Sequence, residues 1–128
     1  MKNLLFLALI ISSHVYGGAI SSLGEVVGFG KFEGQTDDGG RCSVEIDKVG
    51  TNRARVYLSN PRIFKFEFDD NAPTEMTSQI LRISGPTISE GNGQVTTTLV
   101  VEHGRSIGFE RKFCTTKCWV SMRPCVLY

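Results

Sequence analysis

Four cysteines are the residues of this 128-residue sequence with the most obvious chemistry. Cys114, Cys118 and Cys125 lie near the C-terminus together with Trp119, the only tryptophan, whereas Cys42 lies far upstream. Thiols of this kind form disulfides or bind metals, and structural zinc sites commonly show C-x-x-C pairs, which this chain lacks. We therefore predict disulfides, and no metal site.

The pairing of these cysteines has three solutions, and the sequence alone leaves all three open. We favour Cys42–Cys114 with Cys118–Cys125. The second pair would close a tight hairpin through residues 119–124. The first would close a loop of about 70 residues and contribute about 4 kcal/mol in the chain-entropy model.

A catalytic set of side chains is not apparent. His103 is the only histidine after residue 17, and it stands beside Gly104 in a predicted turn. A serine or cysteine nucleophile needs a base and an orienting partner, and no G-x-S-x-G is present. The 13 carboxylates allow some pair in any fold, so they carry no signal for glycoside hydrolysis. We predict a non-enzymatic protein without a cofactor.

Two ligand-binding motifs are incomplete. The glycines around Gly28 and Gly30 fail the dinucleotide pattern, because Glu33 stands where the third glycine belongs and no helix is predicted to follow. The acidic run 69–71 with Glu75 lacks the spacing and central glycine of the calcium loop. We interpret the first as a loosened strand and the second as a solvated loop.

The five candidate binding residues are Trp119 and the basic residues around it, namely Arg111, Lys112, Lys117 and Arg123. The alternative is that they are solvated loop charges that contribute little. Beyond residue 17 the chain has 13 basic and 13 acidic residues, since Lys2 is the only charge before that point. A neutral domain lacks the basic footprint for nucleic acid, so no nucleic-acid partner is predicted.

The N-terminus has the layout of a cleavable secretory signal: Lys2, an apolar run over 4–11, and small or polar residues over 12–18. We prefer a cut after Gly17, with a cut after Ala19 as the alternative. The apolar run is too short to cross a bilayer core of about 30 Å. The prediction is an exported chain, periplasmic or secreted, with no membrane span after cleavage and one domain over 18–128.

The rest of the chain alternates apolar and polar residues with period two, which predicts strands. The turn clusters at 35–40 and 89–93 predict hairpins. Phe64, Phe66 and Phe68 share one face, so we expect them at the centre of the core. Residues 69–78 form the longest polar break, with room for one short helical turn. The predicted strands cover 26–32, 41–49, 54–58, 62–68, 79–88, 94–102, 107–113, 119–122 and 126–128.

About seven to nine short strands at this spacing predict an all-β fold braced by disulfides. Short connections favour antiparallel neighbours in sequence order. We favour a small antiparallel barrel, lipocalin-like or up-and-down, over a β-sandwich.

One hairpin carries a family resemblance. The stretch from Gly28-Phe29-Gly30 to residues 40–44 (GRCSV) resembles the first hairpin of small secreted bacterial metalloprotease inhibitors. The resemblance implies a lipocalin-like barrel that inhibits by inserting its N-terminal residues, here 18–23, into the enzyme cleft. This chain departs from the family, which typically has Trp in place of Phe29 and lacks the two extra cysteines.

Three functions follow as hypotheses. The first is an exported, non-enzymatic β-domain with a binding or structural role in the cell envelope or outside the cell. The second is a secreted protease inhibitor, whose partner would be a protease. The third is a carrier of a small apolar ligand, which Phe64, Phe66 and Phe68 would contact inside the barrel.

Overall fold

The computed structural model describes residues 18–59 and 62–128, so the predicted signal over 1–17 lies outside it. In the described chain one helix, α2 (Gly18–Val26), precedes ten strands. The strands are β1 (Gly30–Gln35), β2 (Arg41–Val49), β3 (Arg53–Ser59), β4 (Ile63–Asp69), β5 (Thr74–Thr77), β6 (Ile80–Glu90), β7 (Gly93–Glu102), β8 (Ser106–Cys114), β9 (Cys118–Met122) and β10 (Cys125–Leu127).

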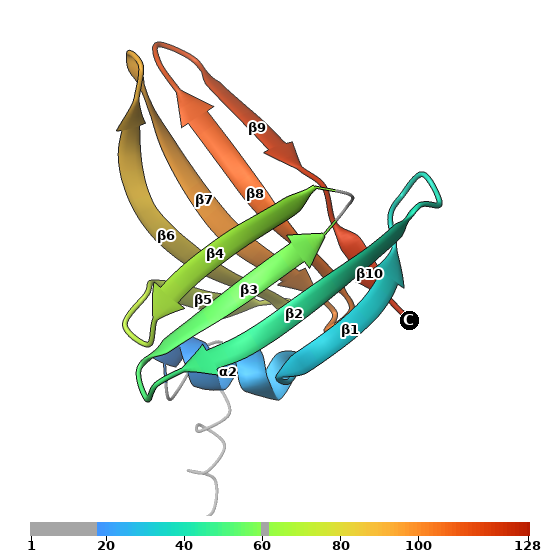
Figure 1. Ribbon diagram of the computed structural model, residues 1–128. Helices are drawn as coiled ribbons and strands as arrows, with labels where there is room; N and C mark the ends of the chain where they lie inside the picture. Colours follow the sequence, from blue (N-terminus) through green and yellow to red (C-terminus); the bar gives the residue numbers. More distant parts are fainter. Residues whose placement is uncertain (1–17, 60–61) are drawn as a thin grey trace, which may run out of the picture.

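All ten strands belong to one antiparallel sheet that curls into a half-barrel (Figure 1). The strand order is β4-β3-β2-β1-β10-β8-β7-β6-β5, and β9 pairs with β8 outside this path. The predicted all-β, antiparallel and disulfide-braced class is confirmed. The order departs from a simple up-and-down barrel, because β10 lies between β1 and β8, and no pairing joins β4 to β5 in the described chain.

Period-two alternation builds the core as expected in three strands. Cys42, Val44 and Ile46 of β2 are buried, and β3 and the first part of β6 bury alternate residues in the same way. β7 instead buries four consecutive residues, 98–101. The prediction for 26–32 is wrong in its first half, because Val26 is the last residue of α2 and residues 27–29 form a turn. Ala19, Ile20 and Leu23 have helical spacing and are buried, and Gly28 and Gly30 adopt positive φ where the chain passes from α2 into β1.

The polar break over 69–78 has a structural role. The backbone oxygen of Asp70 accepts from Ala19 N at 3.2 Å, and its carboxylate accepts from Ile20 N at 2.9 Å. Asp70 thereby caps the first turn of α2, whose amides have no partner within the helix. The segment then forms strand β5 rather than the predicted helical turn.

The three aromatic residues of β4 are not equally buried. Phe66 and Phe68 belong to the core, and the Phe66 ring lies 5.5 Å from that of Phe109 on β8. Phe64, however, is 50% exposed, so the prediction that all three are buried is wrong for this residue. Phe64 faces inward near the start of β4, where the core ends.

The disulfides are Cys42–Cys125 and Cys114–Cys118, so the preferred pairing is wrong although all four cysteines are bonded. Gly34 of β1 pairs with Cys42 on one side and Leu127 on the other. A Cβ at Gly34 would lie 2.8 Å from the carbonyl carbon of Val126 and 2.9 Å from Cys125 Sγ, so glycine allows the backbone of β10 and the disulfide to lie close to β1. Cys114 and Cys118 are opposed in the β8–β9 hairpin. The expectation that strands neighbour one another in sequence order is wrong for the last two, 119–122 and 126–128, since β9 pairs with β8 and β10 with β1 and β8.

Candidate functional site

The far ends of β6, β7, β8 and β9 project beyond the layer formed by β1–β4 (Figure 1). We call this part, residues 86–97 and 110–121, the arm. The turn at 91–92 joins β6 to β7, and the disulfide-closed turn at 115–117 joins β8 to β9. Figure 1 shows β4 crossing in front of β6–β8, so the arm begins where this front layer ends.

Four apolar side chains form one row across the arm: Ile88, Val95, Phe113 and Trp119. Each is the direct register partner of the next, on β6, β7, β8 and β9 in turn. Directly opposed residues project from the same face of a sheet, and Val95 shares its face with the core residue Leu99. This arm row therefore continues the inward face of the half-barrel past the end of its core.

The arm row is open at both ends. Ile88 and Trp119 are each 56% exposed, while Val95 in the middle is buried. The rings of Phe113 and Trp119 stack with centroids 6.0 Å apart and planes inclined by 27°. A Cβ at Gly93 would lie 2.7 Å from the Phe113 ring, which therefore rests directly on the backbone of β7. The row therefore combines exposed apolar ends with a buried middle on an inward face.

One ion pair spans the arm row. Arg111 faces inward one step nearer the core, opposite Thr97 and Ser121, and Glu90 lies at the tip opposite Gly93. The Arg111 Nη2 and Glu90 Oε1 atoms are 2.8 Å apart, and both side chains are more than half exposed. An exposed pair of this kind adds little stability, but it places a charged contact across the apolar row, between its core side and its tip side.

The structure does not bring the five predicted binding residues together. Arg111 and Trp119 face inward on the arm, whereas Lys112 lies on the opposite face, where it pairs with Val120. Lys117 belongs to the turn closed by the Cys114–Cys118 disulfide. Arg123 lies apart from the arm row, lining a surface hollow with Asp38 of the β1–β2 turn.

The pKa of Asp38 is lowered chiefly by the hydrogen bond from Thr36, then by the Gly40 amide, with a smaller contribution from Arg123. Thr36 and Gly40 belong to the same β1–β2 turn as Asp38. The Asp38 carboxylate therefore stabilises its own turn. Arg123 lies near this turn and not on the arm row.

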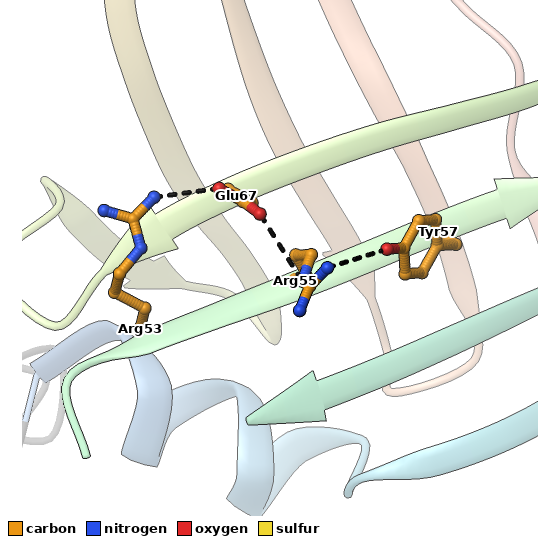
Figure 2. Close-up of polar contacts among 4 residues, drawn as sticks. All are labelled: Arg53, Arg55, Tyr57 and Glu67. Carbon is orange, nitrogen blue, oxygen red and sulfur yellow. Dashed lines mark hydrogen bonds and ion pairs between the residues drawn. The ribbon is translucent and has the colours of Figure 1, made fainter. Parts of the chain in front are cut away.

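The outward face of β3 and β4 carries a charged cluster instead (Figure 2). Glu67 accepts from Arg53 Nη2 at 2.8 Å, its other oxygen lies 3.4 Å from Arg55 Nε, and Arg55 donates to the Tyr57 hydroxyl at 3.1 Å. The hydrogen bond from Arg53 is the largest cause that lowers the pKa of Glu67. These residues bond to one another, so the cluster joins β3 to β4.

The remaining polar candidates have structural partners. His103 has positive φ in the β7–β8 turn, and its Nδ1 lies 2.9 Å from Gln79 Oε1. Asp69 accepts from the Asn71 amide at 2.9 Å, and Asp70 caps α2. Among residues 18–59 and 62–128, no group of three or more histidine, cysteine or acidic side chains is arranged to hold a metal ion.

In the same part of the chain, no helix has the length and apolar character needed to cross a bilayer. No protein-family model, curated protein or solved structure matches this chain. The geometry of the arm is thus what distinguishes a candidate site.

Sequence reasoning missed Ile88, Val95 and Phe113 as companions of Trp119. Each lies in a strand that was predicted, and a row across four strands depends on the register of three hairpins. The turn cluster over 89–93 and the close spacing of Cys114 and Cys118 are the signals that fix two of these registers. Once these two turns fix the registers of β6–β7 and β8–β9, Ile88 is opposite Val95 and Phe113 is opposite Trp119.

Proposed function

We propose that this protein is an exported, non-enzymatic binding domain, periplasmic or secreted, that takes a protein partner on the arm row. The observation that carries the proposal is the alignment of Ile88, Val95, Phe113 and Trp119 on an inward face that no other layer covers in the described chain. The two ends of the row, Ile88 and Trp119, are each 56% exposed, and exposed apolar side chains with polar neighbours are typical of interaction sites.

The residue types support a protein partner. Tryptophan and arginine are enriched among the residues that dominate binding energy at protein interfaces. Trp119 is half exposed beside Phe113, and Arg111 lies on the same face. The Phe113 and Trp119 rings should lose little conformational entropy on binding, because they are already stacked.

Export is supported by the paired cysteines. Two disulfides, and no free cysteine in the described residues, are compatible with an oxidising compartment. The predicted signal over residues 1–17 would deliver the chain there.

No specific observation supports the other two hypotheses, a protease inhibitor and a carrier of a small apolar ligand. The segment 18–23 that an inhibitor would insert belongs to α2, where Ala19, Ile20 and Leu23 are buried. The segment between Cys118 and Cys125 is not closed by a bond between these two cysteines. Two of the three aromatic residues assigned to a ligand cavity, Phe66 and Phe68, instead pack in the core beside Phe109.

Site-specific photocrosslinking tests the proposed function in cells that export the protein. A benzoylphenylalanine in place of Ile88 should crosslink a discrete polypeptide, and the same probe at exposed Lys31 of β1 should not. A Trp119→Ser substitution should remove the adduct while the circular dichroism spectrum is unchanged. Equal adducts from both positions, or an adduct that persists in Trp119→Ser, would contradict binding at the arm row.

A further inference from the structure

Building on the proposed function, we infer that the partner binds as an extended polypeptide segment, which adds to the free edge of β4 as an extra strand and lays its inward side chains on the arm row. The juxtaposition of an unpaired strand edge with an uncovered apolar surface carries this inference. Strand addition uses backbone hydrogen bonds for affinity and alternate side chains for specificity.

β4 offers a regular edge. All seven of its residues pair in unbroken register with β3, and within residues 18–59 and 62–128 no strand pairs with its other side. Proteins usually protect such edges with charged side chains, proline, bulges or very short strands. β4 carries Lys65 but has neither proline nor a bulge, whereas β5, at the other end of the sheet path, has only four residues.

The free edge of β4 lies where the arm begins. A Cβ at Gly85 would lie 2.9 Å from the Phe66 ring, which also contacts Phe109, so the centre of β4 packs on β6 and β8. Ile88 is three residues further along β6 than Gly85, which corresponds to about 10 Å. Neighbouring strands are about 4.8 Å apart, so this distance equals two strand spacings. One strand added beside β4 would continue the front layer and bring its inward side chains onto the arm row (Figure 1).

The exposed side chains define the chemistry of the segment. Inward-facing Phe64 is 50% exposed, like the ends of the arm row, so the segment should carry large apolar residues at alternate positions. On the outward face Glu67 is already paired with Arg53 and Arg55, whereas no carboxylate within the described chain lies at ion-pair distance from Lys65. A carboxylate between the apolar positions would complement Lys65.

A second copy of this chain does not fit the same place. The inward face of its own β4 is covered, because Phe66 packs against β6 and β8. Its β6 and β8 would therefore meet the arm of the first copy. A segment that is not backed by its own sheet avoids this overlap.

A peptide library tests the inference on the full mature protein. The probes are synthetic peptides of about eight residues, to match the length of β4, with Val, Ile, Leu or Phe at alternate positions and Thr, Ser or Glu between them. Fluorescence anisotropy measures binding, and hydrogen exchange measures protection of the β4 amides. We expect selected peptides to contain a glutamate and to protect β4.

N-methylation of the best peptide gives the decisive control. Alternate amides of a strand face opposite edges, so methylation at every second position should weaken binding at least about tenfold in one parity and little in the other. Lys65→Glu should weaken binding of the glutamate peptide by up to about fivefold and favour its lysine analogue, while the control Lys31→Glu should change neither.

The outcomes separate the two proposals. No binding by any member of the library, equal sensitivity to methylation in both parities, or unchanged β4 protection would overturn strand addition. Concentration-dependent self-association through β4 would overturn it as well. Adducts from position 88 that depend on Trp119 would still support a partner on the arm row in each of these cases, and their loss would end the proposed function itself.

Discussion

Phe113 and Trp119 oppose each other directly across β8 and β9, and the next pair towards the tip is the disulfide Cys114–Cys118. The covalent bond therefore fixes the hairpin immediately beside the stacked rings. This arrangement holds an aromatic surface in place without a covering layer. The two disulfides therefore stabilise different parts of the protein, since Cys42 and Cys125 belong to the buried core.

The two disulfides should differ in reactivity and in their contribution to stability. Cys118 is exposed whereas Cys42 and Cys125 are buried, so a mild reductant should open Cys114–Cys118 first. In the chain-entropy model the loop between Cys42 and Cys125 corresponds to about 4.6 kcal/mol and the short hairpin loop to about 2 kcal/mol. Differential alkylation with mass spectrometry, and denaturation of each double Cys→Ser variant, measure both effects. Earlier reduction of Cys42–Cys125 would contradict the assignment.

Loss of Trp119 should affect binding far more than folding. Trp119 is half exposed and lies outside the core, so Trp119→Ala should lower the free energy of unfolding by about 1 kcal/mol or less. The matched core change Phe66→Ala should lower it by about 3–5 kcal/mol, because it leaves a cavity beside Phe109. Urea denaturation followed by circular dichroism compares the two. A large loss of unfolding free energy in Trp119→Ala would instead indicate that the arm row is part of the core.

The Arg53–Glu67 pair should appear in an NMR pH titration. The pKa of Glu67 lies below its ordinary value of 4.5, chiefly because Arg53 donates a hydrogen bond to the carboxylate. Its stabilising contribution is therefore present above the unfolded-state pKa and is lost as the pH falls through the lowered folded-state pKa. Arg53→Gln should raise the pKa of Glu67, and Lys31→Gln should leave it unchanged. Equal Glu67 titration in the parent protein and Arg53→Gln would contradict the pairing.

The alternation of residue types was enough to predict the class of fold and most strands. Cys42, Val44 and Ile46 alternate with polar residues, and their burial follows directly from that pattern. Helix α2 was missed because it is short and its cap, Asp70, comes from a segment fifty residues away. The disulfides were misassigned because Cys42 and Cys125 meet across Gly34, a neighbourhood created by the insertion of β10 beside β1. The arm row required the register of three hairpins at once.

The cap on α2 also predicts the mature N-terminus. Gly18 has φ of 88°, and a Cβ there would lie 2.5 Å from the Asp70 carboxylate. Cleavage after Gly17 would leave the new ammonium group beside this carboxylate, whereas cleavage after Ala19 would remove the start of the capped turn. We expect intact-mass analysis to find a chain that begins at Gly18. Asp70→Ala should lower the free energy of unfolding by about 1 kcal/mol, because it removes the acceptor for the Ile20 amide, and Asp37→Ala should not. A chain that begins at Ile20 would contradict this account.

Fluorescence of the single tryptophan gives the most direct test of binding at the arm row. Because Trp119 is the only tryptophan of the chain and is half exposed, its emission reports on this surface alone. Addition of the crosslinked partner, or of the best library peptide, should shift the emission to shorter wavelength and reduce quenching by acrylamide. Saturable binding that leaves both the emission and the quenching of Trp119 unchanged would contradict the arm row as the binding site.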